Sequence, residues 1–148
     1  EKLNDEFSTD IFTENVLRVK LGVNAIESAK SLYDLIVLDS MVTEKNFAES
    51  LEHQDDVVVY TKLPRGFYIN TPMGKYNPDW AVAFREGSVK HVYFVAETKG
   101  TDDLLSDIRG AENSKIECAR KHFAAISEKD VIFDVAKDYQ TLYNIVTK

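Results

Sequence analysis

Two apolar stretches flank a short turn in the middle of the chain, and this pair restricts the fold more than any other feature. The stretches cover 80–85 and 90–99, and Glu86, Gly87 and Ser88 separate them. Such runs are typical of strands, and glycine readily adopts the positive φ that a tight turn needs. The sequence therefore predicts a β-hairpin centred near Ser88.

The rest of the chain predicts further elements of both types. Strands are expected over 15–21, 33–38, 57–60, 67–70 and 131–135. Helices are expected over 43–53 with Thr43 as the N-cap, from Thr101 to about Phe123, and over 139–146. This order indicates an α/β or α+β domain, in which helices flank a mixed β-sheet.

Composition excludes several classes of protein. The chain has 148 residues, of which 44% are hydrophobic, so it can bury a core and is not a disordered or fibrous type. Its single cysteine, Cys118, excludes a disulfide framework and a Cys-rich zinc site. No apolar run is long enough to span a membrane, and the first residues lack the features of a signal peptide. We expect a cytoplasmic protein with no membrane partner.

Charge is distributed unevenly along the chain. The formal net charge is −7, which by itself argues against a nucleic-acid partner. Residues 1–61 carry 5 basic and 13 acidic side chains, a net of −8, whereas 62–148 carry 13 and 12, a net of +1. If some of the later acids hold cations, the second part becomes a plausible partner for phosphate. The alternative is that the acidic surface only keeps the domain soluble.

The open end of the predicted hairpin brings two carboxylates together. Strand alternation places Glu97 and Lys99 on the same face, and folding about Ser88 places Asp79 opposite Glu97. Two carboxylates that close repel each other unless a proton or cation lies between them. Oxygen ligands alone favour Mg²⁺, or Mn²⁺ in its place.

Lys99 completes a possible hydrolytic site. An ammonium group beside a metal-bound water can stabilise hydroxide and the negative charge that develops on an attacked phosphorus. Asp79, Glu97 and Lys99 therefore fit phosphodiester hydrolysis. The alternative interpretation is a solvated cluster of ion pairs at the end of a sheet.

Supporting residues have two interpretations each. Glu44 is predicted to face the sheet and either to join the site or to interact with the dipole of its helix. Glu112 and Lys115 lie on the inward face of the long helix, where they either pair with each other or support the site as orienting residues.

Basic side chains that could contact DNA phosphates are Lys62, Arg65, Lys75, Arg85, Lys90, Arg109, Arg120 and Lys121. Lys75 and Tyr76 are the best DNA-binding candidates, because they are expected in the loop that leads to Asp79.

Longer motifs resemble a known family. Residues 70–80 read Asn-Thr-Pro-Met-Gly-Lys-Tyr-Asn-Pro-Asp-Trp, and residues 93–101 read Tyr-Phe-Val-Ala-Glu-Thr-Lys-Gly-Thr. Together they closely resemble the PD-(D/E)XK nuclease motif of the Res subunit of type III restriction enzymes. The likeness extends over most of the chain and is densest over 40–125. It implies a restriction-endonuclease-like core in which Asp79, Glu97 and Lys99 are catalytic, and Pro78 matches the proline of the motif.

The resemblance also implies partners and a role. Residues 1–148 would form a single nuclease domain cut from a larger prokaryotic helicase–nuclease subunit, acting on duplex DNA with a methyltransferase subunit that reads the site. Asp79, Glu97 and the backbone carbonyl of Thr98 would hold Mg²⁺. No phosphate-binding Gly-x-x-x-x-Gly-Lys-Ser/Thr loop is present, so no ATP site is expected here. Two rivals remain: a repair or recombination nuclease acting on branched or single-stranded DNA, and a non-catalytic DNA-binding scaffold.

Overall fold

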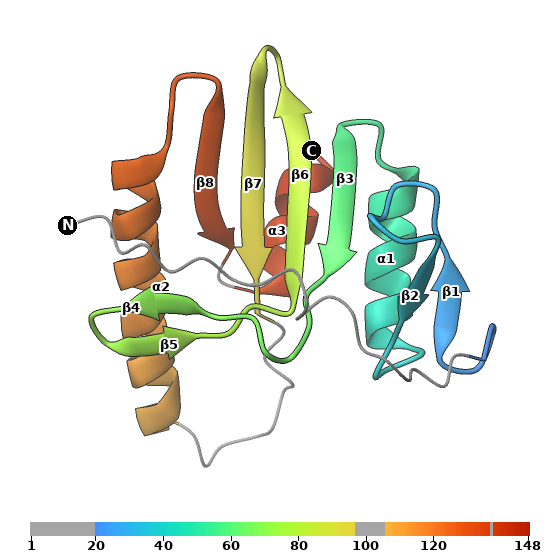
Figure 1. The fold of residues 1–148 in the computed structure, drawn as a ribbon, viewed down its shortest axis with the longest axis horizontal. Coiled ribbons are helices and arrows are strands. Elements are labelled where there is room, and N and C mark those ends of the chain that lie inside the picture. The colour runs from blue at the N-terminus through green and yellow to red at the C-terminus, as the bar shows by residue number, and fades with distance from the viewer. Residues whose placement is uncertain (1–19, 97–105, 137) are drawn as a thin grey trace.

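The computed structural model describes residues 20–96, 106–136 and 138–148, without the side chains of 106–109, 111 and 112. The strands are β1 (Ala25–Glu27), β2 (Leu35–Val37), β3 (Val57–Lys62), β4 (Ile69–Thr71), β5 (Gly74–Tyr76), β6 (Trp80–Glu86), β7 (Val89–Val95) and β8 (Val131–Ala136). The helices are α1 (Thr43–His53), α2 (Ser106–Ile126) and α3 (Tyr139–Val146). Figure 1 shows their arrangement.

A four-stranded sheet in the order β3-β6-β7-β8 forms the centre of the molecule (Figure 1). β6 is antiparallel to both β3 and β7, whereas β7 and β8 are parallel. Parallel neighbours need a long crossover, and α2 lies in the connection from β7 to β8. The predicted fold class is therefore confirmed: this is an α/β domain with a mixed sheet and helices on its faces.

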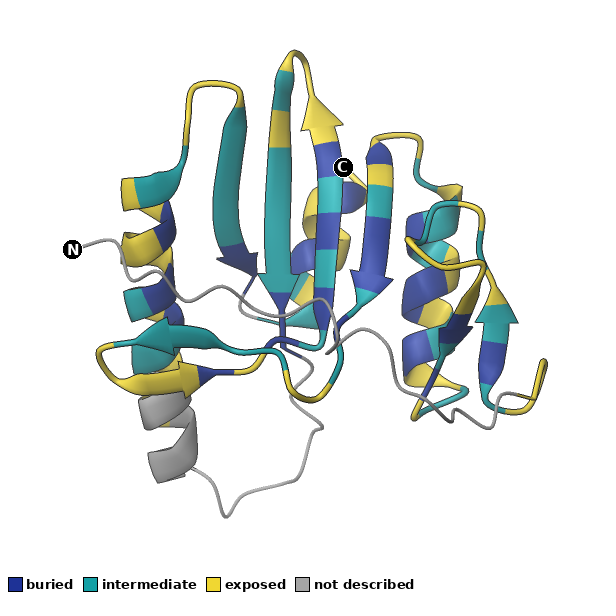
Figure 2. Cartoon of the chain, viewed as in Figure 1, coloured by how far each residue is buried: buried dark blue, intermediate teal, exposed yellow. Residues whose placement is uncertain are grey.

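The sheet separates two hydrophobic clusters. On one face, Trp80 and Val82 pack with Phe47 and Leu51 of α1 and with Leu142 of α3. On the other face, Ala96 and Val135 pack with Tyr76 of β5 and with the α2 residues Ile116 and Phe123. Figure 2 shows buried residues along β6 and along one side of α1 and of α2.

The predicted hairpin is present, but its register differs by one residue from the prediction. Gly87 has a φ of 63°, as the turn requires, and the pairs run from Glu86 with Val89 to Trp80 with Val95. The loop therefore contains two residues rather than three centred on Ser88, a length whose twist matches that of the flanking strands. Continued outward, this register sets position 79 opposite 96 rather than 97.

Several local predictions need correction. β5 was expected to be loop, β1 was not predicted, and β2 and β4 are shorter or shifted relative to 33–38 and 67–70. Thr43 is the first residue of α1 rather than its N-cap, and its N–H donates to Ser40 Oγ at 3.2 Å. The predicted strand residues 15–19 and the start of the long helix at 101–105 lie outside the described residues.

One carboxylate adds to the core packing of Ile36 in attaching the small β1–β2 ribbon to the rest of the fold. Glu52, in the last turn of α1, accepts hydrogen bonds from Ser28 Oγ at 2.7 Å and from the Ala29 N–H at 2.8 Å. The Tyr60 hydroxyl of β3 donates to the same carboxylate at 2.9 Å. Burial acts to raise the pKa of Glu52, but these hydrogen bonds outweigh it and lower the pKa below its ordinary value.

The last helix follows the prediction for 139–146. Asp138 is its N-cap, and its carboxylate accepts from both the backbone N–H and the hydroxyl of Thr141, each at 2.7 Å. Tyr139 then contacts Phe47 with ring centroids 4.6 Å apart, which joins α3 to α1. Across the described ranges, the helices are too short or too polar to cross a membrane.

Candidate functional site

Asp79 lies where three strands meet at one edge of the sheet. Its N–H donates to the Val95 carbonyl at the end of β7 at 2.8 Å, and its own carbonyl accepts from the Leu63 N–H, just after β3, at 2.7 Å. The residue before it, Pro78, is buried and has no N–H to donate. The backbone of Asp79 is thus fixed on both sides immediately before β6 begins.

The strand directions bring other chain segments to this same edge. β3 ends at Lys62, which pairs with Trp80 at the start of β6, and Trp80 pairs with Val95 at the end of β7. Val95 in turn pairs with Ala136 at the end of β8. Figure 1 shows these ends together at the lower edge of the sheet. We call this end of the sheet, formed by Lys62, Asp79, Trp80, Val95 and Ala136, the Asp79 edge.

The other residues of the predicted catalytic set are not described. Glu97, Thr98 and Lys99 directly follow Ala96 but lie outside the described residues. Side chains alternate between the faces up to Ala96: Tyr93 and Val95 pack on the α1 face, and Phe94 and Ala96 on the α2 face. The predicted cross-strand pairing of Asp79 with Glu97 needs correction, because the observed register continues to position 96 opposite 79. Within 20–96, 106–136 and 138–148, no three His, Cys, Asp or Glu side chains gather closely enough to hold a metal ion.

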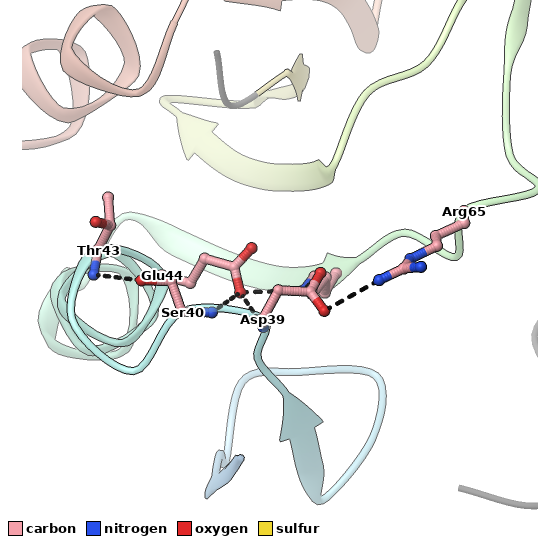
Figure 3. Close-up of polar contacts among 6 residues, drawn as sticks. Asp39, Ser40, Thr43, Glu44 and Arg65 are labelled. Carbon is pink, nitrogen blue, oxygen red and sulfur yellow. Dashed lines mark hydrogen bonds and ion pairs between the residues drawn. The ribbon is translucent and has the colours of Figure 1, made fainter. Parts of the chain in front are cut away.

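Glu44 belongs to a charged cluster near the Asp79 edge (Figure 3). As predicted from its helical position, it faces inward, and its side chain is 4% exposed. Its carboxylate accepts from the Asp39 N–H at 2.6 Å, from the Ser40 N–H at 3.2 Å and from Lys62 Nζ at 3.0 Å. These partners satisfy a buried carboxylate that would otherwise be costly.

Lys62 joins two acids in this cluster. Besides Glu44, its ammonium group lies 2.8 Å from Asp39, whose other carboxylate oxygen lies 3.4 Å from Arg65. The hydrogen bond from Lys62, followed by the charges of Lys62 and Arg65, holds the pKa of Asp39 below its ordinary value despite partial burial. The sequence predicted Lys62 as one of several possible phosphate contacts. In the structure its ammonium group instead forms ion pairs with the carboxylates of Asp39 and Glu44.

The predicted DNA-binding pair is separated by the structure. Lys75 is exposed, and its ammonium group lies 3.8 Å from the centroid of the Tyr68 ring. Tyr76 was expected in a loop but is the last residue of β5 and is fully buried in the core against α2. Its ring therefore presents no surface to a DNA phosphate.

The inward charges of the long helix are partly described. Lys115 is half-buried, and its Cε atom would lie 3.6 Å from a Cβ placed on Gly74, so its stem runs beside β5. Glu112 lies in α2, but its side chain is outside the described part. Whether these two pair with each other therefore stays a prediction.

Comparison with known proteins identifies the family. A family model described as an endonuclease domain matches residues 29–140. The chain belongs to this endonuclease-domain family. The match covers α1, the whole four-stranded sheet and α2, so this restriction-endonuclease-like domain includes the Asp79 edge and positions 97–99. Comparison with curated proteins found no match, and neither did comparison with solved structures.

Membership in this family gives the Asp79 edge a chemical context. The backbone of Asp79 is held immediately before a central strand, beside the end of a second strand, and this position lies within the matched endonuclease domain. The cluster of Asp39, Glu44, Lys62 and Arg65 stands beside this edge and has no net formal charge.

Proposed function

We propose that this endonuclease domain is the metal-dependent nuclease of a type III restriction enzyme, cutting phosphodiester bonds in duplex DNA. The observation that carries the proposal is the position of Asp79, whose backbone joins the end of β7 to the residue after β3. Chain continuity brings Glu97 and Lys99 shortly after the end of β7. The longer motifs around Asp79 and Glu97 support the type III assignment.

The donor set suits a hard divalent cation. Asp79 and Glu97 would hold Mg²⁺ through carboxylate oxygens, with the carbonyl of Thr98 as a further ligand, and Mn²⁺ could replace it. When bound, the ion supplies Lewis acidity that lowers the pKa of a water molecule. Lys99 would stabilise negative charge at the reacting phosphate, and the backbone bonds of Asp79 would keep its carboxylate in place.

The proposal includes partners beyond this chain. A helicase region of the same subunit would deliver DNA, and a methyltransferase subunit would supply sequence recognition. Two such domains, each cutting one strand, would together make a double-strand break. Without those partners, we expect this chain to cut weakly and without sequence preference.

Plasmid nicking tests the proposal. The 148-residue chain at high concentration should convert supercoiled plasmid to the open circular form with Mg²⁺ or Mn²⁺. Asp79→Asn and Lys99→Ala should each reduce the nicking rate at least about 100-fold, in the range typical of lost charge stabilisation in a catalytic site. Asp55→Asn is the matched control, because Asp55 is exposed at the opposite end of β3.

Metal affinity separates ligand loss from other defects. Calorimetric titration with Mn²⁺ should show weaker binding in Asp79→Asn but near-normal binding in Asp55→Asn. Unchanged Mn²⁺ affinity in Asp79→Asn would show that the ligand assignment is wrong. Nicking by Asp79→Asn at the rate of the unmodified chain would reject the hydrolytic role of this edge.

A further inference from the structure

The β4–β5 hairpin stands next to the Asp79 edge and is part of the connection from β3 to β6. The side-chain amide of Asn77 donates to the Phe67 carbonyl at 3.0 Å and closes the hairpin at its base. Asp79 follows Asn77 by two residues, so only Pro78 separates the base of the hairpin from the residue with the proposed catalytic carboxylate. Figure 1 shows the hairpin lying across α2.

One side of the hairpin is anchored in the core. Tyr76 is fully buried in the cluster that includes Ile116 of α2, and Ile69 packs against the same cluster. Phe67 stacks on Phe94 of β7, with ring centroids 6.1 Å apart. These contacts give the hairpin a fixed orientation relative to the sheet.

The other side and the tip of the hairpin face solvent. The tip is formed by Pro72 and Met73, and Met73 is 55% exposed although it is a large apolar residue. Gly74, with a φ of 109°, permits the turn, and Thr71 Oγ1 reinforces it by donating to the Gly74 carbonyl at 2.6 Å. An ordered turn therefore presents an apolar tip.

The chain segment that contains the hairpin carries only basic charged residues. From Val57 to Pro78 the chain carries no acidic residue and three basic ones, Lys62, Arg65 and Lys75. Carboxylates occupy Lys62, whereas the Arg65 side chain is 91% exposed and makes only a 3.4 Å contact with Asp39. The Tyr68 ring holds the Lys75 ammonium group in place, which reduces the entropy lost when it meets an anion.

We propose that the β4–β5 hairpin is the element of this domain that enters a groove of duplex DNA. Lys75 and Arg65 contact backbone phosphates on either side, and the Pro72–Met73 tip packs against the groove. A two-stranded ribbon has the width that the major groove admits. The inference rests on the proposed function, because it places the hairpin next to the phosphodiester that would be hydrolysed at the Asp79 edge.

Binding without cleavage provides the test. Fluorescence anisotropy of a labelled duplex of about 20 base pairs, without divalent metal, gives affinity at several salt concentrations. Lys75→Met keeps most of the aliphatic stem but removes one charge, so affinity should fall several-fold and the slope of log affinity against log salt should decrease by about one. Arg65→Gln should behave similarly. Met73→Ala should weaken binding at every salt concentration without changing the slope.

Lys129→Met is the matched control, because Lys129 is exposed in the connection between α2 and β8, at the opposite edge of the sheet. Its affinity and slope should equal those of the unmodified chain. Normal binding by both Lys75→Met and Arg65→Gln would overturn the inference, as would an equal loss in Lys129→Met. Thermal melting of each variant shows that the exposed substitutions leave the fold intact.

The two proposals fail in different ways. Asp79→Asn should bind the duplex as well as the unmodified chain does, even though it does not nick plasmid. If Asp79→Asn nicks plasmid at the rate of the unmodified chain while Lys75→Met binds poorly, the catalytic assignment of Asp79 fails and the hairpin remains the DNA-binding element. If Asp79→Asn is inactive while every hairpin variant binds normally, the hairpin inference alone fails.

Discussion

The Lys62 ammonium group lies 3.0 Å from the carboxylate of Glu44, and neither side chain is more than 17% exposed. This contact joins the end of β3 to the first turn of α1. Ion pairs at the surface contribute little to stability, but removing one member of a buried pair leaves the other charge without compensation. The Lys62–Glu44 pair therefore gives a sharp test of what holds α1 to the sheet.

Lys62→Met should lower the free energy of unfolding by about 2–3 kcal/mol, because Glu44 keeps two backbone donors but loses its countercharge. Urea denaturation measures the change. The double variant Lys62→Met with Glu44→Gln should recover much of the loss. A coupling energy below about 0.5 kcal/mol in this cycle would contradict the structural role of the pair.

Glu52 predicts a specific dependence of stability on pH. Its pKa is lowered in the folded state, where burial opposes but does not outweigh the hydrogen bonds from Ser28, Ala29 and Tyr60. The carboxylate therefore stabilises the fold above its unfolded pKa of about 4.3, and this contribution is lost as pH falls through the lower folded value.

Replacing this carboxylate should change how the free energy of unfolding depends on pH in the acidic range. We expect Glu52→Gln to be less stable than the unmodified chain at pH 7, with the difference narrowing as pH falls from about 5 to 3. Urea midpoints across that pH range measure it. Glu49→Gln, at an exposed residue, serves as control. If its stability difference from the unmodified chain narrowed equally with falling pH, the effect would come from the loss of one negative charge and not from the hydrogen bonds of Glu52.

Phe47 should be among the most costly positions to truncate. It is 1% exposed, and its ring lies 5.1 Å from that of Trp80 and 4.6 Å from that of Tyr139, measured between centroids. Phe47→Ala should reduce the free energy of unfolding by about 3–5 kcal/mol, since it opens a cavity between α1, α3 and the sheet. Val42→Ala, at a residue 72% exposed, should change it by less than about 0.5 kcal/mol.

The N-cap of α3 offers a smaller and more local effect. Asp138→Ala removes the acceptor for both the N–H and the hydroxyl of Thr141 and should cost about 1 kcal/mol. Asp138→Asn keeps an oxygen acceptor and should lose much less. Thermal unfolding of the two variants side by side measures the difference, and equal losses would show that the cap does not depend on the acceptor.

Periodicity in the sequence is sufficient to predict the long elements of this fold. Phe47 and Leu51 recur at helical spacing, and they do face the sheet from α1. β5 was missed because Gly74–Tyr76 is too short for alternation to be visible. The hairpin register was misjudged because turn length depends on backbone geometry at Gly87, which leaves no periodic signal in the flanking strands.

The site could be predicted only where neighbouring residues carry the signal. Pro78 before a strand indicated how Asp79 enters the sheet, and helical spacing indicated that Glu44 points inward. Its partner Lys62 is 18 residues away on another element, so only the tertiary fold brings the two together. The same holds for the Leu63–Asp79 hydrogen bond, which joins residues that follow β3 and precede β6.

The hydrogen bond between Asn77 and Phe67 holds the two ends of the intervening segment together. Lys62 and Trp80 already define how β3 and β6 align, so an exchange of residues 68–76 for a loop of different length would leave that alignment intact. A chimaera carrying a foreign loop there, with an apolar residue retained where Tyr76 fills the interior, would keep the backbone position of Asp79 while presenting a different surface beside it.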